Sequence, residues 1–207
     1  MSFREKLIIF AKAPVAGQVK TRLVPPLTPE EACRLYRSWA VDTYAAALFL
    51  GGVAPEVAYQ AHPDFPNPDW MAQGRGQVPF FYQAAGDLGA KLADAFDRAF
   101  KPRCERAAAI GTDSPGLPAE YIREGFERLK DHDLVLGPAQ DGGYYLIGLR
   151  QKAVPELFEG ISWSTPDVLA GTMKAAENLG LSVWLLPEYF DVDRPEDLKK
   201  IKAAGVN

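Results

Sequence analysis

Short apolar runs alternate along the chain with longer segments in which apolar residues recur at helical spacing. The first run, Leu7 to Ala11, predicts a buried strand. Thr28 then predicts the start of a long helix, because it is a good N-cap, Pro29 suits the first helical position and Glu31 completes a capping box. The glycine pair at 51–52 ends this helix.

The rest of the chain continues the same alternation. Strands are predicted at 53–61, 78–83, 107–113, 133–139, 143–149 and 181–192, and helices at 88–100, 118–130, 165–180 and 195–205. Pro55 places the second strand at an edge or breaks it early, and the Pro- and Gly-rich residues 62–76 predict an irregular surface segment. Strands that alternate with helices predict one α/β domain over residues 1–207, with a mostly parallel sheet covered by helices on both faces.

Composition excludes several classes of protein. Among 207 residues, 47% are hydrophobic and 24% are charged, as in ordinary globular domains, and the net charge of −4 disfavours a nucleic-acid surface. Cys33 and Cys104 form no C-x-x-C pair, so we expect reduced thiols in a cytoplasmic protein. The start of the chain does not resemble a secretory signal, and no apolar stretch approaches the roughly 18 residues of a membrane span.

Polar residues follow several predicted strands, at the sheet edge where α/β proteins bind ligands. The segment from Lys12 to Arg22 follows the first strand and contains Gly17 and Lys20. It matches neither G-x-x-x-x-G-K-[ST] nor G-x-G-x-x-G. A flexible glycine near two cations nevertheless predicts a phosphate-binding loop, with Arg22 as a fork and Lys20 as a point charge. The alternative is a connection with two solvated cations.

Three aspartates lie at two further strand ends. Asp113 follows the strand at 107–113, and Asp191 and Asp193 follow the last one and point the same way if the backbone is extended. Converging carboxylates suit a hard divalent cation that shares its ligands with phosphates, so Asp113 and Asp193 are the predicted metal ligands. Whether Asp191 also binds the metal is left open. The alternatives are a turn at Asp113 and an N-cap at Asp193.

Two glycine-containing segments complete the predicted site. Asp141, Gly142 and Gly143 separate two strands, where the glycines either form a tight turn or let a ligand approach the backbone. Asp141 is the candidate general base or hydroxyl-binding group. Gly86 and Asp87 precede a helix and either offer its N-terminus to a ligand or only start the helix. Trp163 is a candidate wall of the pocket.

Four motifs together resemble a known family. "FAKAPVAGQVKTRL", "GTDSPGLP", "GPAQDGGYYLIGL" and "FDVDRPEDL" are similar to the bacterial glycosyltransferase-like family named radical-SAM/selenodomain-associated transferase. This family belongs to the nucleotide-diphospho-sugar transferases of the glycosyltransferase A fold, and the similarity covers about Leu7 to Leu198. It implies a Rossmann-like three-layer αβα sandwich that binds a nucleotide or nucleotide sugar with Mg²⁺ or Mn²⁺ and transfers a glycosyl group to a small acceptor.

The resemblance also bears on the metal site. Asp113 keeps the first aspartate of the superfamily's D-x-D motif, and "DVDRPEDL" resembles the D-x-D-T-P-E-D-L ending of related nucleotidyltransferases, in which Asp193 would complete the metal site. Arg194 replaces the usual threonine of that ending. The implied ligand set is therefore Asp113 and Asp193, and its remaining members are open.

A second family resemblance implies a different reaction. The segment from Lys12 to Leu35 is also similar to 2-phospho-L-lactate guanylyltransferase and, more loosely, to molybdenum cofactor guanylyltransferase. These enzymes move a nucleotidyl group from GTP onto a phosphate. Glycosyl transfer is the preferred prediction because Asp141, away from the metal, can act as a base and the two glycines beside it would let a sugar lie against the backbone. The lack of Lys and Arg between Leu134 and Leu149 adds to this preference, since a guanylyltransferase needs cations for a second phosphate. A nucleotide sensor without catalytic activity is the third hypothesis, because a fold does not fix a function.

Overall fold

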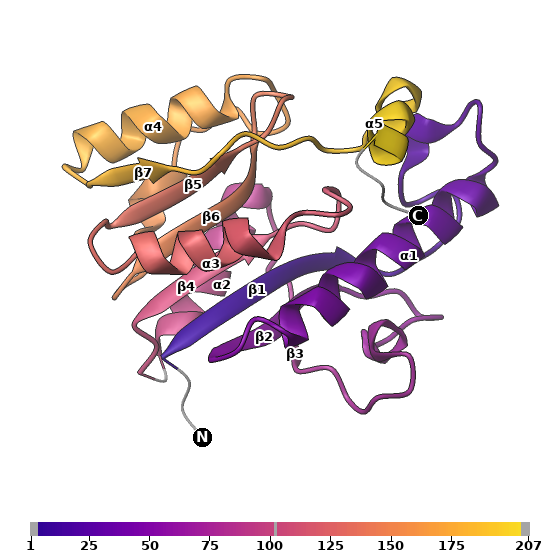
Figure 1. Ribbon diagram of the computed structural model, residues 1–207, viewed down its shortest axis with the longest axis horizontal. Helices are drawn as coiled ribbons and strands as arrows, with labels where there is room; N and C mark the ends of the chain where they lie inside the picture. Colours follow the sequence, from indigo (N-terminus) through magenta and orange to yellow (C-terminus); the bar gives the residue numbers. More distant parts are fainter. Residues whose placement is uncertain (1–3, 102, 204–207) are drawn as a thin grey trace.

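The computed structural model describes residues 4–101 and 103–203. One sheet has the strand order β3-β2-β1-β4-β6-β5-β7 (Figure 1). Its strands are β1 (Glu5–Lys12), β2 (Val53–Gln60), β3 (Phe80–Tyr82), β4 (Arg106–Ile110), β5 (Leu134–Pro138), β6 (Tyr144–Arg150) and β7 (Val183–Leu185). The α-helices are α1 (Pro29–Leu48), α2 (Leu88–Phe100), α3 (Ala119–Arg128), α4 (Val168–Asn178) and α5 (Leu198–Ala203). Short 3-10 helices cover Thr21–Leu23, Asp69–Ala72, Pro155–Phe158 and Pro195–Asp197.

The predicted mostly parallel sheet is confirmed. β6 pairs antiparallel with both β4 and β5, whereas the other neighbouring strands are parallel. β6 is antiparallel to β5 because a tight turn joins them. Such a turn reverses the direction of the chain, whereas a parallel pair needs a longer crossover connection. Pro55 lies opposite Leu7 of β1, while β3 begins only opposite Val57, so the proline lies where this side of β2 has no strand partner, as expected for an edge position.

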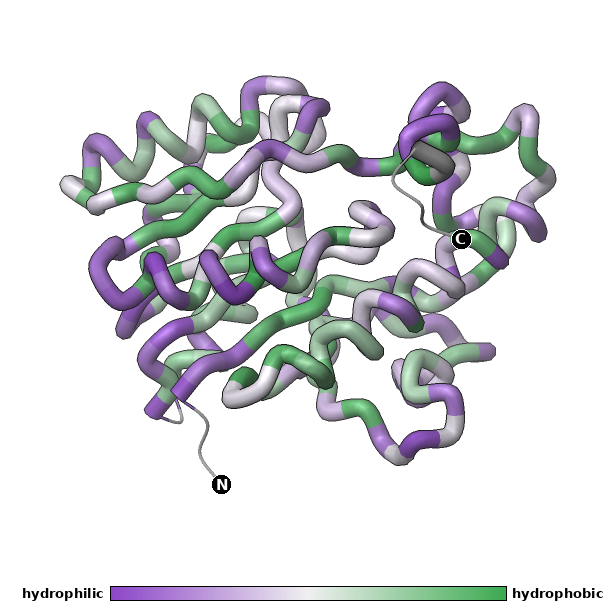
Figure 2. Tube along the Cα trace, in the orientation of Figure 1, coloured by the Kyte–Doolittle hydropathy of each residue, from purple (hydrophilic) through white to green (hydrophobic). Residues whose placement is uncertain are grey.

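Helices cover both faces of the sheet, which confirms the three-layer sandwich. One core cluster joins Ile9 of β1 to Tyr36 of α1 and Phe126 of α3. A second cluster on the opposite face joins Ile8 of β1 to Phe96 of α2 and also contains part of α4. The alternation of side chains along β1 therefore supplies both cores. Figure 1 shows α1 and α3 in front of the sheet and α2 behind it, and Figure 2 shows hydrophobic residues concentrated along the strands.

The chain after β7 crosses the carboxyl edge of the sheet to reach α5 (Figure 1). The predicted strand at 181–192 is therefore too long, since only Val183–Leu185 pairs as a strand before the chain leaves the sheet. A third cluster, which contains Leu23, Trp39 and Val192, attaches this crossing segment to the first loop and to α1. Residues 204 and 205 of the predicted closing helix lie outside the described residues. The crossing segment therefore lies beside the first loop at the carboxyl edge of the sheet, although the two are far apart in the sequence.

The predicted start of α1 is confirmed in detail. The Thr28 hydroxyl accepts a hydrogen bond from the Glu31 N–H (3.2 Å), and the Glu31 carboxylate accepts one from the Thr28 N–H (2.8 Å). This reciprocal pair satisfies two N–H groups that would otherwise lack partners at the helix start. Among the described helices, none is both long and apolar enough to cross a membrane.

Candidate functional site

An open cavity of about 940 Å³ lies at the carboxyl ends of the parallel strands. The first loop, the Asp113 loop, the β5–β6 turn and the C-terminal crossing segment all contribute to its walls. The predicted site residues that line it are Lys12, Lys20, Arg22, Gly86, Asp87, Asp113, Asp141, Gly143 and Asp193. Gly17 and Gly142 are absent from this lining. The structure thus brings nine of the eleven predicted residues to one cavity.

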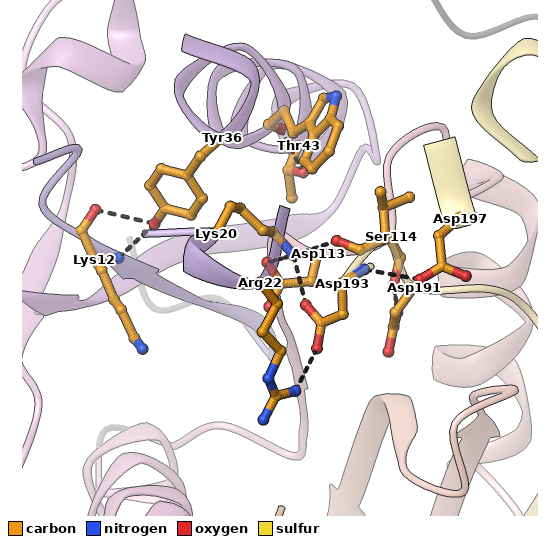
Figure 3. Close-up of polar contacts among 12 residues, drawn as sticks. Lys12, Lys20, Arg22, Tyr36, Thr43, Asp113, Ser114, Asp191, Asp193 and Asp197 are labelled. Carbon is orange, nitrogen blue, oxygen red and sulfur yellow. Dashed lines mark hydrogen bonds and ion pairs between the residues drawn. The ribbon is translucent and has the colours of Figure 1, made fainter. Parts of the chain in front are cut away.

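Lys20 points inward and is held by three oxygen atoms (Figure 3). Its ammonium nitrogen lies 2.6 Å from Asp113 Oδ1 and 2.9 Å from Asp193 Oδ1, and it donates a hydrogen bond to the Val192 carbonyl at 2.7 Å. The Lys20 side chain is only 4% exposed. Burial alone would lower the pKa of Lys20, but the charges of the two aspartates and the hydrogen bonds to them outweigh burial and raise this pKa. Lys20 is therefore a buried, fully bonded cation in this structure.

Lys12 and Arg22 face the cavity more freely than Lys20 does. The Arg22 guanidinium lies 3.4 Å from Asp193 Oδ2, yet 62% of the side chain is exposed. Lys12 is exposed, and its backbone is fixed by Tyr36, whose hydroxyl accepts from the Lys12 N–H (2.6 Å) and donates to the Lys12 carbonyl (3.0 Å). Tyr36 lines the cavity and was missed by sequence reasoning, because its position on α1 resembles an ordinary core position.

The crossing segment is attached to the Asp113 loop through both backbone and side chains. The Val192 N–H donates to the Asp113 carbonyl at 2.9 Å, and the Ser114 hydroxyl donates to Asp191. Asp193 does not cap the last helix, because the residue at that N-cap is Arg194 and the Asp193 carboxylate pairs with Lys20 and Arg22. The capping alternative for Asp193 is therefore wrong.

Asp191 is costly to ionise in the folded protein. Its burial, reinforced by the charges of Asp113 and Asp141, raises the pKa of Asp191 to about 6, although the hydrogen bond from Ser114 opposes the shift. A carboxyl whose pKa is higher in the folded state than in the unfolded chain stabilises the fold while it is protonated. This contribution is complete below about pH 4 and is lost as the pH rises through about 6.

Asp191→Asn is therefore expected to stabilise the metal-free protein at pH 7.5 by about 2–3 kcal/mol, because asparagine cannot ionise. The gain should disappear below about pH 4. Urea unfolding in EDTA at both pH values measures the difference. Asp133→Asn is a control of opposite sign, since bonds from Ser182 lower the pKa of Asp133 and its loss should destabilise the protein at pH 7.5. A gain for Asp191→Asn that is equal at both pH values would contradict this explanation.

Asp141 and Gly142 each have a structural role in the β5–β6 turn. Asp141 Oδ1 accepts a hydrogen bond from the Gly143 N–H at 2.9 Å. Gly142 has φ +89°, and a Cβ on it would lie 2.1 Å from the Pro166 carbonyl oxygen. Gly142 is thus needed for the turn and for close packing, not for approach of a ligand. The role of Asp141 as a base or hydroxyl-binding group stays a prediction, and its exposed side chain faces the cavity.

The N-terminus of α2 forms another wall. Asp87 caps the helix by accepting from the Ala90 N–H at 2.9 Å, which supports a start signal for this residue. A Cβ on Gly89 would lie 2.7 Å from Trp163 Nε1, so glycine lets the indole pack against the helix. Trp163 lines the cavity as expected, and sequence reasoning missed the nearby Lys91. The one sequence signal that places Lys91 near the cavity is its position one helical turn after Asp87.

The side chains of the site supply part of the ligand set of a divalent ion. Asp113 and Asp193 already direct one oxygen each at a single cation, the Lys20 ammonium. Within residues 4–101 and 103–203, no group of three or more His, Cys, Asp or Glu side chains is placed to hold a metal. Mg²⁺ commonly uses one or two carboxylates and completes its shell with water and phosphate oxygens. Two aspartates therefore fit such an ion if phosphate is also bound.

Comparisons with known proteins agree with this architecture. A crystal structure from Desulfovibrio desulfuricans G20, whose description as a nucleotide-diphospho-sugar transferase is itself an inference, is 29% identical with a TM-score of 0.86. The match covers 98% of this chain and 96% of that one. 4-Diphosphocytidyl-2C-methyl-D-erythritol synthase from Anaerococcus prevotii has a TM-score of 0.65 and 11% identity, over 98% and 96% of the two chains, and supports the fold alone.

Two sequence comparisons cover parts of the chain. 2-Phospho-L-lactate guanylyltransferase from Methanocaldococcus fervens is 28% identical over 107 residues, which are 50% of this chain but only 46% of that enzyme. A family model matches residues 43–165, from α1 to the segment before α4. The chain belongs to this family, which is described as "Uncharacterized protein conserved in bacteria (DUF2064)".

Proposed function

We propose that this protein is a transferase that uses a nucleotide-activated donor, and that it transfers a glycosyl group from a nucleoside-diphosphate sugar. The observation that carries the proposal is the meeting of cations and carboxylates in one cavity at the carboxyl edge of the sheet. Ligands of open α/β sheets bind at this edge. The volume of about 940 Å³ is large enough for a nucleotide sugar.

The phosphates of the donor are assigned to the first loop. Arg22 and Lys12 line the cavity, and the exposed Arg22 guanidinium can bind a phosphate as a fork. Asp113 and Asp193 would hold Mg²⁺ or Mn²⁺ there, and such an ion supplies Lewis-acid stabilisation of a leaving diphosphate. Lys20 keeps these two carboxylates in place, and its predicted contact with phosphate requires its ammonium to leave them.

Other residues of the cavity lining suit a sugar. Trp163 contributes an aromatic ring to the lining, Ser164 a hydroxyl group, and Asp141 a carboxylate that can accept hydrogen bonds from sugar hydroxyls. Asp141 would also accept the proton of an incoming acceptor hydroxyl. The similarity to the Desulfovibrio desulfuricans protein over nearly the full length supports the broader proposal of a transferase that uses a nucleotide.

Nucleotidyl transfer to a phosphorylated acceptor is a second candidate, which a specific observation favours. Lys91 from α2 and Arg194 from the crossing segment line the same cavity, so cations reach it from outside the β5–β6 segment. The lack of Lys and Arg in that segment therefore no longer argues against a second phosphate group. The partial similarity to 2-phospho-L-lactate guanylyltransferase supports this candidate.

Product analysis distinguishes these reactions. The protein is incubated with Mn²⁺ and either a panel of nucleotide sugars or nucleoside triphosphates with phosphorylated acids, and nucleoside diphosphate and pyrophosphate are measured separately. We expect nucleoside diphosphate from a nucleotide sugar, and none from Asp113→Asn prepared in parallel, which controls for contaminating enzymes. Pyrophosphate release without turnover of any sugar donor would replace glycosyl by nucleotidyl transfer. Binding without any product would favour the nucleotide sensor.

A further inference from the structure

The Lys20 ammonium occupies the place between the two carboxylates that are proposed to hold a divalent ion. It is close to both Oδ1 atoms, at 2.6 Å from Asp113 and 2.9 Å from Asp193 (Figure 3). A Mg²⁺ ion bound by the same two oxygens would lie about 2.0–2.1 Å from each of them. Two cations cannot share this place, because they would overlap and repel each other. Lys20 and a metal bound by these oxygens are therefore mutually exclusive.

Lys20 is held firmly in this inward position. The third hydrogen of the ammonium is donated to the Val192 carbonyl at 2.7 Å, and the ammonium also lies 5.6 Å from the centre of the Trp39 ring. Its backbone has φ +48°, a left-handed conformation that lysine rarely adopts and that persists only where surrounding contacts enforce it. Lys20 is thus a positioned internal cation rather than a solvated surface lysine.

We propose that Lys20 is the resident cation of the Asp113–Asp193 pair and excludes a divalent ion until the phosphates of a bound nucleotide draw its ammonium away. This inference rests on the proposed function, because it concerns the same donor and metal site. Asp113 and Asp193 are 50% and 39% exposed, so both carboxylates are accessible from the cavity once the ammonium leaves. Nucleotide and metal binding are then coupled, since each favours the state in which Lys20 has left the carboxylates.

A purely structural ion pair leads to a different expectation. If Lys20 only stabilises the crossing segment, its removal lowers stability and leaves metal binding unchanged. If Lys20 excludes the metal, its removal leaves two carboxylates without a cation between them, and a divalent ion binds there without nucleotide. Metal affinity in the absence of nucleotide therefore separates the two roles.

The test measures Mn²⁺ binding by calorimetry, without nucleotide, in the wild-type protein and in Lys20→Met. We expect binding at least about tenfold tighter in Lys20→Met, because an opposing charge in direct contact with the site has been removed. Arg22→Met is the matched control: it removes one positive charge beside Asp193 (3.4 Å) but leaves the ammonium between the carboxylates. It should change the affinity by less than about threefold, as expected for an exposed ion pair. Mn²⁺ should also raise the Tm of Lys20→Met more than that of the wild type.

Unchanged Mn²⁺ affinity in Lys20→Met, or an equal gain in Arg22→Met, would overturn the exclusion. Lys20→Gln keeps N–H donors for the carboxylates without the charge, and the same comparison applies to it if Lys20→Met does not fold. The measurement contains no nucleotide. A tenfold gain in the Mn²⁺ affinity of Lys20→Met would therefore still support the exclusion if the product assay failed. An unchanged Mn²⁺ affinity would contradict the exclusion even if the protein were shown to be a transferase.

Discussion

Replacing Asp113 or Asp193 by asparagine is expected to weaken Mn²⁺ binding in the presence of a nucleoside diphosphate by about 100-fold. Each substitution removes a charged oxygen ligand while it keeps the size of the side chain, and hard cations depend on such ligands. The loss should be similar for the two residues, because their Oδ1 atoms both face the place occupied by Lys20. Calorimetric titration of Mn²⁺ into the protein saturated with nucleotide measures the effect.

Asp97→Asn provides the control for this prediction. Asp97 is 55% exposed on α2 and pairs with Lys101 directly after this helix, and neither residue lines the cavity. Removing one exposed negative charge there should leave the Mn²⁺ affinity unchanged within about a factor of two, since solvent and salt screen it. Equal affinities of the wild type and both site variants would show that the metal does not bind between Asp113 and Asp193.

Gly142→Ala is expected to destabilise the protein by about 3 kcal/mol or more, whereas Gly143→Ala should cost less than about 1 kcal/mol. Gly142 combines a positive φ with a backbone oxygen 2.1 Å from the position of a Cβ, and backbone cannot move aside easily. A Cβ on Gly143 would meet only the Asp141 side chain, at 3.2 Å. Urea unfolding measures both variants, and similar stabilities would contradict the packing role of Gly142.

The same pair of variants tests the sequence-based interpretation of this turn. From the sequence, the two glycines either form a tight turn or let a ligand approach the backbone, and both are among the predicted site residues. Of the two glycines only Gly143 lines the cavity, so only Gly143 can let a ligand approach its backbone. Gly143→Ala should therefore weaken donor binding while the free energy of unfolding stays nearly unchanged. Undiminished donor binding by a stable Gly143→Ala protein would remove this residue from the site.

Local patterns were sufficient to predict the fold and most of the cavity. The apolar runs and the capping box at Thr28 define elements through residues that are close in sequence, and a parallel sheet then brings the ends of its strands to one edge. Lys12, Arg22 and Asp141 reach the cavity for this reason. Predictions of this kind succeed because they depend on secondary structure and on one general property of α/β sheets.

The environment of Lys20 could not be predicted in this way. The Lys20 ammonium donates hydrogen bonds to Val192 and Asp193, which lie more than 170 residues away in the sequence. These contacts exist because the crossing segment packs on the first loop and α1. No local pattern shows that a lysine in a surface-like loop turns inward. The roles of Gly89 and Gly142 are hidden for a similar reason, since each packs against the segment that contains Trp163 and Pro166. Contacts between distant segments decide all three.

Anomalous diffraction from crystals grown with Mn²⁺ and a nucleoside diphosphate would locate the metal, the phosphates and the Lys20 ammonium in one experiment. We expect one Mn²⁺ peak within coordination distance of Asp113 and Asp193, a diphosphate beside Arg22, and the Lys20 ammonium moved away from the two carboxylates. A diphosphate bound outside the cavity, or a Mn²⁺ ion bound away from both aspartates, would contradict this expectation.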